Sequence, residues 1–223
     1  MPRSGVLPAS SRNGEDTVET HHYYMYNKPF GQVCARRDER FPTVMEAFAG
    51  LHLPGLTHVG RLDRQTTGLL LVTDDGAWCR QMLEPAMGKE KEYEFLVMGT
   101  LEEEKLQRLC TGLTLSYGAR ESEAVQTRPA RVSVLETGVL SDVLETLHPE
   151  VRERLRGNRP DQSVVRGRMV LTEGRRHQVR RMLKEVGCYC IALHRLRVGA
   201  YVLGDLEPGC FAAVEPGKAT MEP

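Results

Sequence analysis

The stretch GRLDRQTTGLLLVT, residues 60–73, joins a polar loop to an apolar run. The run LLLV (69–72) has no polar alternation, which is typical of a strand buried on both faces. In the loop, Asp63 stands between Arg61 and Arg64, and guanidinium groups favour the ionised form of a neighbouring carboxylate. A permanently charged carboxylate suits a nucleophile better than a general acid. The alternative is an aspartate that only caps the turn through backbone amides.

The segments around this stretch predict further strands and helices. We expect one strand that begins at His22 and further strands over residues 91–98, 164–172, 189–192, 201–203 and 211–214. The expected helices are 43–51 with Thr43 as cap, 76–83 capped by Asp74 or Asp75, 101–113 opened by a Thr100–Glu103 capping box, and 176–186 ended by Gly187. Because strands and helices do not alternate regularly, we predict an α+β fold with a mixed, largely antiparallel sheet flanked by helices.

The length of 223 residues predicts one main domain. Residues 1–20 are rich in Ser, Pro, Gly and charge, which predicts a flexible N-terminal arm. We expect the folded domain to span 21–216, with a surface insertion near 138–162 in which Ser141 caps a helix, and a C-terminal tail at 217–223.

Overall composition excludes several protein classes. The longest apolar run, 69–72, is far shorter than the ~18 residues of a membrane span. The six cysteines have neither paired nor zinc-ligand spacing, so we expect reduced thiols in an intracellular compartment and no metal site. Thirty basic and thirty acidic residues give no net charge, yet residues 166–197 hold nine Lys or Arg against two Glu.

Within this basic segment, EGRRHQVRRM (173–182) predicts the start of a helix with cations on neighbouring faces. Arg176 and Arg180 are four residues apart, as are His177 and Arg181. Cations near a helix N-terminus oppose the helix dipole, a cost that a bound phosphate or a buried carboxylate would offset. A solvated basic face explains the same composition.

Four motifs, in this order, resemble the RsuA family of pseudouridine synthases, which modify uridines in ribosomal RNA. They are NKPFG (27–31), GRLDRQTTGLLLVTDDG (60–76), KEY (91–93), and EGRRHQVRRM (173–182) followed by Leu193, Arg195 and Gly199. The resemblance is to RluE-like members without an N-terminal RNA-binding module. The histidine in RRHQVR is also similar to the GRxHQxR motif of the related RluA family.

The resemblance implies a role for individual residues. Asp63 matches the catalytic aspartate, Tyr93 the aromatic residue beside the target base, and Arg180 the arginine that pairs with the aspartate. Arg61 matches the position next to a flipped nucleotide. The remaining candidates for contact with RNA or the rim of the site are Lys28, Lys91, Arg175, Arg176, His177, Gln178, Arg181 and Arg195.

The implied reaction breaks the glycosidic bond of a uridine, turns the base and rejoins it through carbon 5, without a redox cofactor or metal. Asp63 could attack the sugar, attack the uracil ring, or remove the proton at the second sugar carbon. The nucleotide must leave the RNA stack to be reached. The resemblance further implies a monomeric, cytoplasmic enzyme, with the mitochondrion and plastid as alternative compartments.

Two other function classes are weighed against this one. A non-catalytic RNA-binding factor of ribosome assembly would keep the basic helix, but it has no need for Asp63, Tyr93 and Arg180 together. A hydrolase that uses Ser or Cys with His is disfavoured, since no nucleophile stands at a recognisable elbow beside His177 or His194.

Overall fold

The computed structural model describes residues 21–116 and 124–217. The strands are β1 Tyr23–Lys28, β2 Thr57–Val59, β3 Thr66–Thr73, β4 Lys91–Met98, β5 Thr114–Ser116, β6 Ala124–Gln126, β7 Arg131–Val139, β8 Ser163–Leu171, β9 Tyr189–Val198, β10 Tyr201–Val202 and β11 Phe211–Ala213. The α-helices are α1 Gly76–Leu83, α2 Glu103–Thr111, α3 Leu140–Val143, α4 Pro149–Leu155 and α5 Gln178–Glu185. Short 3-10 helices are η1 Val44–Leu51, η2 Pro85–Met87 and η3 Leu144–Thr146. The expected arm at 1–20, and all of the expected tail except residue 217, lie outside the described residues.

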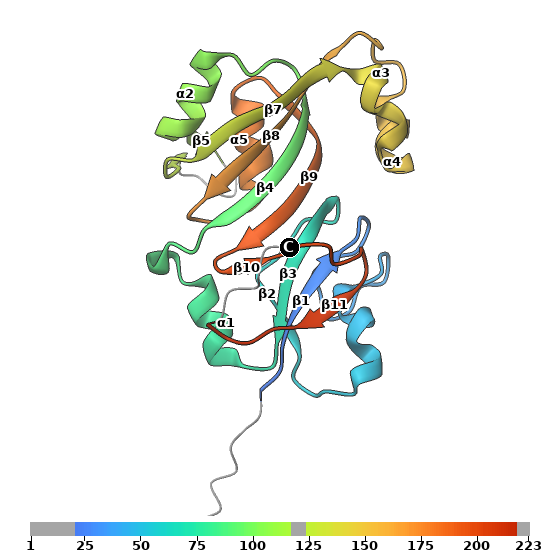
Figure 1. The fold of residues 1–223 in the computed structure, drawn as a ribbon, viewed down its shortest axis with the longest axis vertical. Helices are drawn as coiled ribbons and strands as arrows, with labels where there is room; N and C mark the ends of the chain where they lie inside the picture. Colours follow the sequence, from blue (N-terminus) through green and yellow to red (C-terminus); the bar gives the residue numbers. More distant parts are fainter. Residues whose placement is uncertain (1–20, 117–123, 218–223) are drawn as a thin grey trace, which may run out of the picture.

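One mixed sheet runs through the whole molecule (Figure 1). Its strand order is β11-β1-β3-β9-β4-β8-β7, with β2 beside β3 and β10 beside β9. Every pair in it is antiparallel except β3 with β9, whose short parallel register joins residues 66–68 to residues 193–195. The α+β class with a largely antiparallel sheet is therefore confirmed.

The apolar run in β3 is buried on both faces, as its sequence predicts. Leu70 and Val72 pack in the core cluster that contains Phe48 of η1. Leu69 and Leu71 pack in a second cluster with Trp78 of α1. Burial of each leucine side chain contributes about 2 kcal/mol, so this strand is a major source of stability for the lower part of the molecule in Figure 1.

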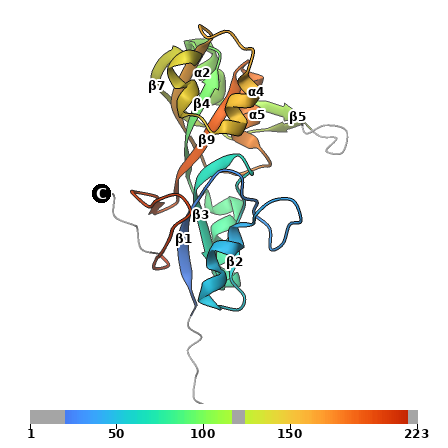
Figure 2. The same cartoon turned by 90° about the vertical axis from the view of Figure 1, so that its right-hand side faces the viewer.

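The other part of the sheet, formed by β4, β7, β8 and β9, is covered by α2 and α5 on one face (Figure 2). Alternate residues of β4 point to this face, where Phe95 and Val97 pack with Leu109 of α2 and Met182 of α5. Leu96 points to the opposite face and belongs to a different cluster.

The parallel pair of β3 and β9 joins the two parts of the sheet. At this joint Gly68 has a φ of +99°, and a Cβ there would overlap the backbone carbonyl of Arg195. Only glycine fits this conformation and this close approach. The joint also brings together segments that are 126 residues apart in the chain, as between Thr67 and Leu193.

The segment 138–162, expected to be a surface insertion, contains the end of β7 and the short helices α3, η3 and α4. Strand β7 continues to Val139, and the helices that follow bury Leu140, Leu147, Val151 and Leu155. These four side chains pack against Leu96, Val164 and Ile191 of the sheet. The prediction of Ser141 as a cap is wrong, because this residue lies inside α3, whose N-cap is Val139.

The structure confirms one expected helix cap and contradicts another. Asp75, of the two candidates, caps α1 by accepting hydrogen bonds from the backbone of Ala77 and Trp78. The expected Thr100–Glu103 box is wrong: the N-cap of α2 is Glu102, and the Thr100 hydroxyl donates to its carboxylate at 3.1 Å.

Candidate active site

Residues 60–65, hereafter the Asp63 loop, connect β2 to β3 and are held by backbone hydrogen bonds. The amide of Gly31 donates to the carbonyl of Arg64, and the amide of Thr66 donates to that of Asp63, both at 2.9 Å. The Lys28 ammonium group donates to the carbonyls of Pro29, Arg64 and Thr66 at 3.0, 3.3 and 2.9 Å.

Lys28 is fully buried beneath this loop, and burial lowers its pKa to about 8. Lys28, a candidate for contact with RNA or the rim of the site, thus lies beneath the Asp63 loop with its ammonium group bonded to backbone carbonyls. The NKPFG motif contributes an internal cross-link that shapes the Asp63 loop.

The Asp63 carboxylate lies between two groups from the start of α5. Arg180 Nε is 3.7 Å from Asp63 Oδ2, and His177 Nε2 is 3.3 Å from Asp63 Oδ1. Arg180 also donates to the backbone carbonyls of Gln65 and Cys190, each at 3.2 Å. The structure thus brings together Asp63 and Arg180, 117 positions apart in the numbering, and adds His177 to them.

The turn before α5 explains how His177 reaches Asp63. Helix α5 begins at Gln178, so Arg176 and His177 precede the helix and do not share its faces with Arg180 and Arg181, contrary to the sequence expectation. His177 has a left-handed φ of 53°, a conformation that is uncommon outside glycine and more frequent for His than for most residues.

A buried network fixes this turn. Glu173 Oε1 accepts from the backbone amide of Arg128 at 2.9 Å and from Gln178 Nε2 at 2.6 Å. Gln178 Oε1 in turn accepts from the amide of Arg175 at 2.9 Å. Gln178 is buried, so it holds the turn in shape and does not present its amide to bulk solvent.

Tyr93 lies on the same cavity as Asp63. This cavity, about 60 Å³, is lined by Arg61, Leu62, Asp63, Thr66, Tyr93, Leu171, Glu173, Gly174, Arg175, His177, Gln178, Val179, Arg180 and Leu193. It is flanked by a wider opening of about 260 Å³ at Asp63, Arg64, Gln65, His177 and Arg180. His177 lines both the inner cavity and the wider opening, and its side chain is 45% exposed.

Two hydroxyl groups of this cavity form no hydrogen bond to other described residues. Thr66 Oγ1 is buried without a hydrogen-bond partner in the part of the chain that the structure describes. The Tyr93 ring is only 9% exposed, and its hydroxyl likewise forms no hydrogen bond to any residue in the described ranges. Both residues line the cavity that contains Asp63.

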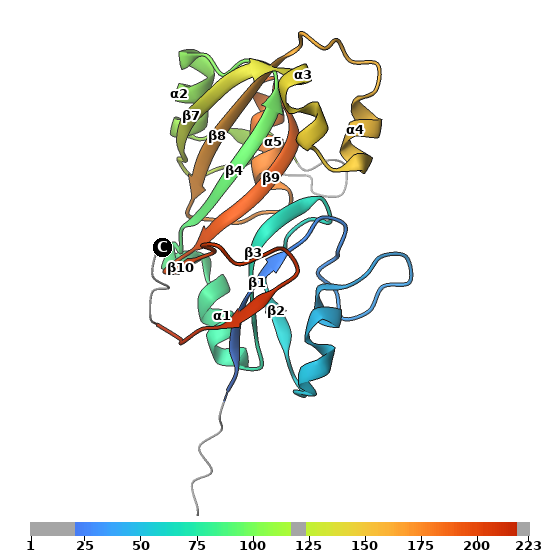
Figure 3. The same cartoon turned by 45° about the vertical axis from the view of Figure 1, so that its right-hand side comes forward.

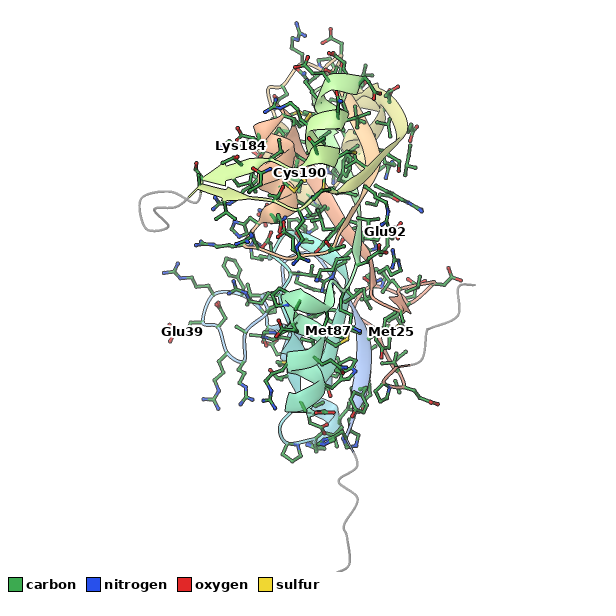
Figure 4. The ribbon with its side chains drawn as sticks, turned by 90° about the vertical axis from the view of Figure 1, so that its left-hand side faces the viewer. Met25, Glu39, Met87, Glu92, Lys184 and Cys190 are labelled. Carbon is green, nitrogen blue, oxygen red and sulfur yellow. The ribbon has the colours of Figure 1, made fainter. Side chains whose placement is uncertain are left out.

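A larger hollow of about 1020 Å³ lies beside residues 36–41 and η1. Figure 4 shows Glu39 at the outer end of this loop, pointing away from the body of the protein. The larger hollow contains neither Asp63 nor Tyr93, so the smaller cavity beside Asp63 is the better candidate for the active site.

The remaining candidates for RNA contact fall into two groups. Arg61, Arg175 and Arg176 are exposed at the rim. Lys91 is partly buried, and burial lowers its pKa. Arg181 is also partly buried and donates to the carbonyl of Ser116 at 2.9 Å. Arg195 is buried, donates to the carbonyl of Leu69 at 2.7 Å, and lies 6.0 Å from the centre of the Tyr93 ring.

The opposite face of the sheet carries a ladder of ion pairs. Glu92 lies on this side, whereas Lys184 of α5 lies on the other (Figure 4). The pairs are Glu90 with Arg131 and Arg197, Glu92 with Arg168 and Arg197, and Arg166 with Glu94 and Glu136. Three arginines of the basic segment 166–197 are thus paired with glutamates on the face of the sheet opposite α5.

Within the described residues, no group of three or more His, Cys, Asp or Glu side chains is arranged to hold a metal ion. The same part of the chain has no helix of the length and hydropathy needed to cross a membrane. All six cysteines are free thiols.

The sequence model of the RNA pseudouridylate synthase family matches residues 22–185, which include both the Asp63 loop and the start of α5. The chain belongs to this family. The synthase is 35% identical to the ribosomal small subunit pseudouridine synthase A of Yersinia pestis over 188 residues, which are 84% of this chain and 66% of that protein. Its identity to the protein of the same name from Escherichia coli K12 is 32% over 200 residues, 88% and 73% of the two chains.

Solved structures support the same assignment. A crystal structure of a pseudouridylate synthase superposes with a TM-score of 0.67 at 30% identity, over 89% of this chain and 72% of that one. Human RNA Pseudouridylate Synthase Domain Containing 1 has a TM-score of 0.53 at 16% identity, over 79% and 74% of the two chains, and shows a common fold alone.

Sequence reasoning did not single out two residues of the synthase cavity. Thr66 and Glu173 both lie within the recognised motifs. For Glu173 the available signal was the unfavourable interaction between nearby cations and the helix dipole, which a buried carboxylate would offset. The orphaned hydroxyl of Thr66 has no signal in the sequence.

Proposed function

We propose that this chain isomerises uridine to pseudouridine in RNA, with ribosomal RNA as the substrate class. The observation that carries the proposal is a single carboxylate, Asp63, placed between Arg180 and His177 on a cavity walled by Tyr93, in a member of the RNA pseudouridylate synthase family. The ribosomal substrate is supported by the relatives, which are named ribosomal small subunit pseudouridine synthases.

The reaction breaks the bond between N1 of uracil and the anomeric carbon, then forms a bond from that carbon to C5. C5 loses a proton and N1 gains one, so the atoms balance without an added reagent. Asp63 is the group placed to begin this sequence, by attack on the sugar, by attack on the uracil ring, or by removing the proton at the second sugar carbon. Arg180 pairs with the carboxylate and orients it.

Tyr93 and the exposed rim serve binding. The target nucleotide must be flipped out of its stack, and an aromatic wall beside the carboxylate can hold the flipped base. Arg61 and Arg175 line the cavity, Arg176 is exposed in the turn before α5, and we expect these three cations to contact the phosphates that flank the target nucleotide.

The test is Asp63→Asn, which keeps the side-chain shape and removes the charge. We expect loss of nearly all tritium release from RNA labelled at C5 of uridine, with an unchanged circular dichroism spectrum. Pseudouridine mapping of ribosomal RNA from cells with and without the protein identifies the target. Turnover near the wild-type rate in Asp63→Asn would contradict the assignment, and retained RNA binding without any wild-type turnover would favour the non-catalytic RNA-binding factor.

We further propose that residues 21–216 form the catalytic domain and that it acts as a monomer in the cytoplasm. The continuous sheet from Tyr23 to Ala213 supports the domain limits. Light scattering of the full chain tests the monomer, and imaging of the tagged protein separates the cytoplasm from the mitochondrion and plastid.

A further inference from the structure

Glu150, in the first turn of α4, contacts two consecutive residues of the Asp63 loop. Its Oε1 atom forms an ion pair with Arg64 Nη2 and accepts a hydrogen bond from Gln65 Nε2 at 3.0 Å. A single carboxylate oxygen therefore fixes the two side chains that follow Asp63. Nothing in the reaction described above uses Glu150 or the segment that carries it.

Glu150 lies on helix α4, which packs against the sheet. Val151 and Leu155, on the same helix, are buried in the cluster that contains Leu96 and Ile191 of the sheet. The helix is also tied to the turn after β1, because the ring of its N-cap His148 stacks on Phe30 at a centroid distance of 3.9 Å. Figure 3 shows α4 above the end of β1 and the start of β3.

The contacts of Glu150 lead directly to the reacting carboxylate. The Arg64 guanidinium, held by Glu150 on one side, lies over the Phe41 ring at 4.5 Å on another. The backbone carbonyl of Gln65 accepts the hydrogen bond from Arg180, which pairs with Asp63. Displacement of Gln65 therefore moves both Asp63 and its cation.

We propose that Glu150 is a positioning residue for Asp63, and that segment 138–162 serves to brace the Asp63 loop. This inference rests on the proposed function, since the positioning matters to catalysis only if Asp63 reacts. The Glu150 side chain is 38% exposed, so its ion pair adds little to global stability. Its effect is on geometry, where a displacement of about 1 Å can cost ~10²-fold in rate.

The test compares Glu150→Ala with Glu153→Ala on the same helix. Glu153 pairs with Arg156 at 2.8 Å, both side chains are largely exposed, and the pair does not reach the Asp63 loop, so it is a matched control. We expect Glu150→Ala to lower kcat by about 10-fold or more, with KM within about two-fold and an unchanged melting temperature. Glu150→Gln keeps an acceptor oxygen for Gln65 and should fall between Glu150→Ala and the wild type.

A second measurement separates this inference from the proposed function. Hydrogen exchange of the peptide covering residues 60–66 reports on the amides of Leu62 and Thr66, which bond to Cys34 Sγ and the Asp63 carbonyl. We expect faster exchange there in Glu150→Ala and not in Glu153→Ala. Faster exchange in a protein whose wild type converts no uridine would sink the proposed function and leave the bracing role intact. Unchanged exchange, or unchanged kcat despite faster exchange, overturns the inference.

Discussion

Replacement of Arg180 by alanine tests how α5 is attached to the Asp63 loop. The substitution removes the ion pair with Asp63 and both hydrogen bonds to the carbonyls of Gln65 and Cys190. These bonds connect α5 to the Asp63 loop on one side and to β9 on the other. The cost in stability therefore has two separable sources.

The magnitude follows from the geometry of each contact. Arg180 and Asp63 are 20% and 33% exposed, which places their pair between exposed pairs at ~0–1 kcal/mol and buried ones at ~3–5 kcal/mol, nearer the lower figure. Each hydrogen bond from the charged donor contributes about 1 kcal/mol at this length. The sum is about 3 kcal/mol, which corresponds to a fall in melting temperature of about 6–12 °C for a chain of this size.

Asp63→Asn is the matched comparison, because it removes the charge of the pair and leaves both backbone hydrogen bonds of Arg180. It should cost about 1 kcal/mol or less, so thermal unfolding followed by circular dichroism should separate the two variants clearly. Equal losses in melting temperature, or an Arg180→Ala variant within about 2 °C of the wild type, would refute this account of the attachment.

Three further outcomes are expected. Thr66→Val removes a buried hydroxyl that lacks a partner within the described structure, so stability should rise by about 1 kcal/mol while KM for RNA increases; a lower melting temperature would contradict this. Tyr93→Phe should keep RNA affinity in a filter-binding assay, whereas Tyr93→Leu should lose about 1–3 kcal/mol of stacking. A ~10²-fold slower turnover of the Phe variant would assign proton removal to the hydroxyl, and lost affinity would make the residue structural. For Lys28, the folded pKa of about 8 lies below the ordinary value of 10.5, so the unfolded chain binds more protons between these values. The stability of the wild type relative to Lys28→Met should therefore rise from pH 8 to pH 10.5, and a flat difference in urea titrations would exclude the burial of this ammonium.

Motifs with a strong local pattern were predictable from the sequence. The unbroken apolar run of β3 and the alternation in β4 indicated strands because each reflects direct contact with a core. Strand β7 was not predicted, since most of its residues are exposed and its backbone pairs with β8, which the sequence does not show. The leucines of segment 138–162 were not predicted to be core residues, because they stand among charged residues and Pro149 in the sequence.

Several members of the candidate site were predictable, but the directions in which their side chains point were not. The resemblance to the family placed Asp63, Arg180 and Tyr93 in one site, because each lies in a matched motif, and all three line the same cavity. The same motifs gave no indication that Lys28 and Arg195 point inward, since a cation that binds backbone carbonyls is identical in sequence to one that binds phosphate. The ion pairs of Arg166, Arg168 and Arg197 depend on which strands are neighbours, and this is a property of the fold.

The parallel joint between β3 and β9 has a consequence for when the enzyme becomes active. Asp63 lies in the loop before β3, on one side of the joint. Tyr93 of β4 and Arg180 of α5 lie on the other side, with β9. Pairing across 126 residues is slow because a long loop must close before any contact rewards it. An intermediate in which only one part has folded holds an incomplete site. We therefore expect a chain in which this joint has not formed to leave uridine unchanged.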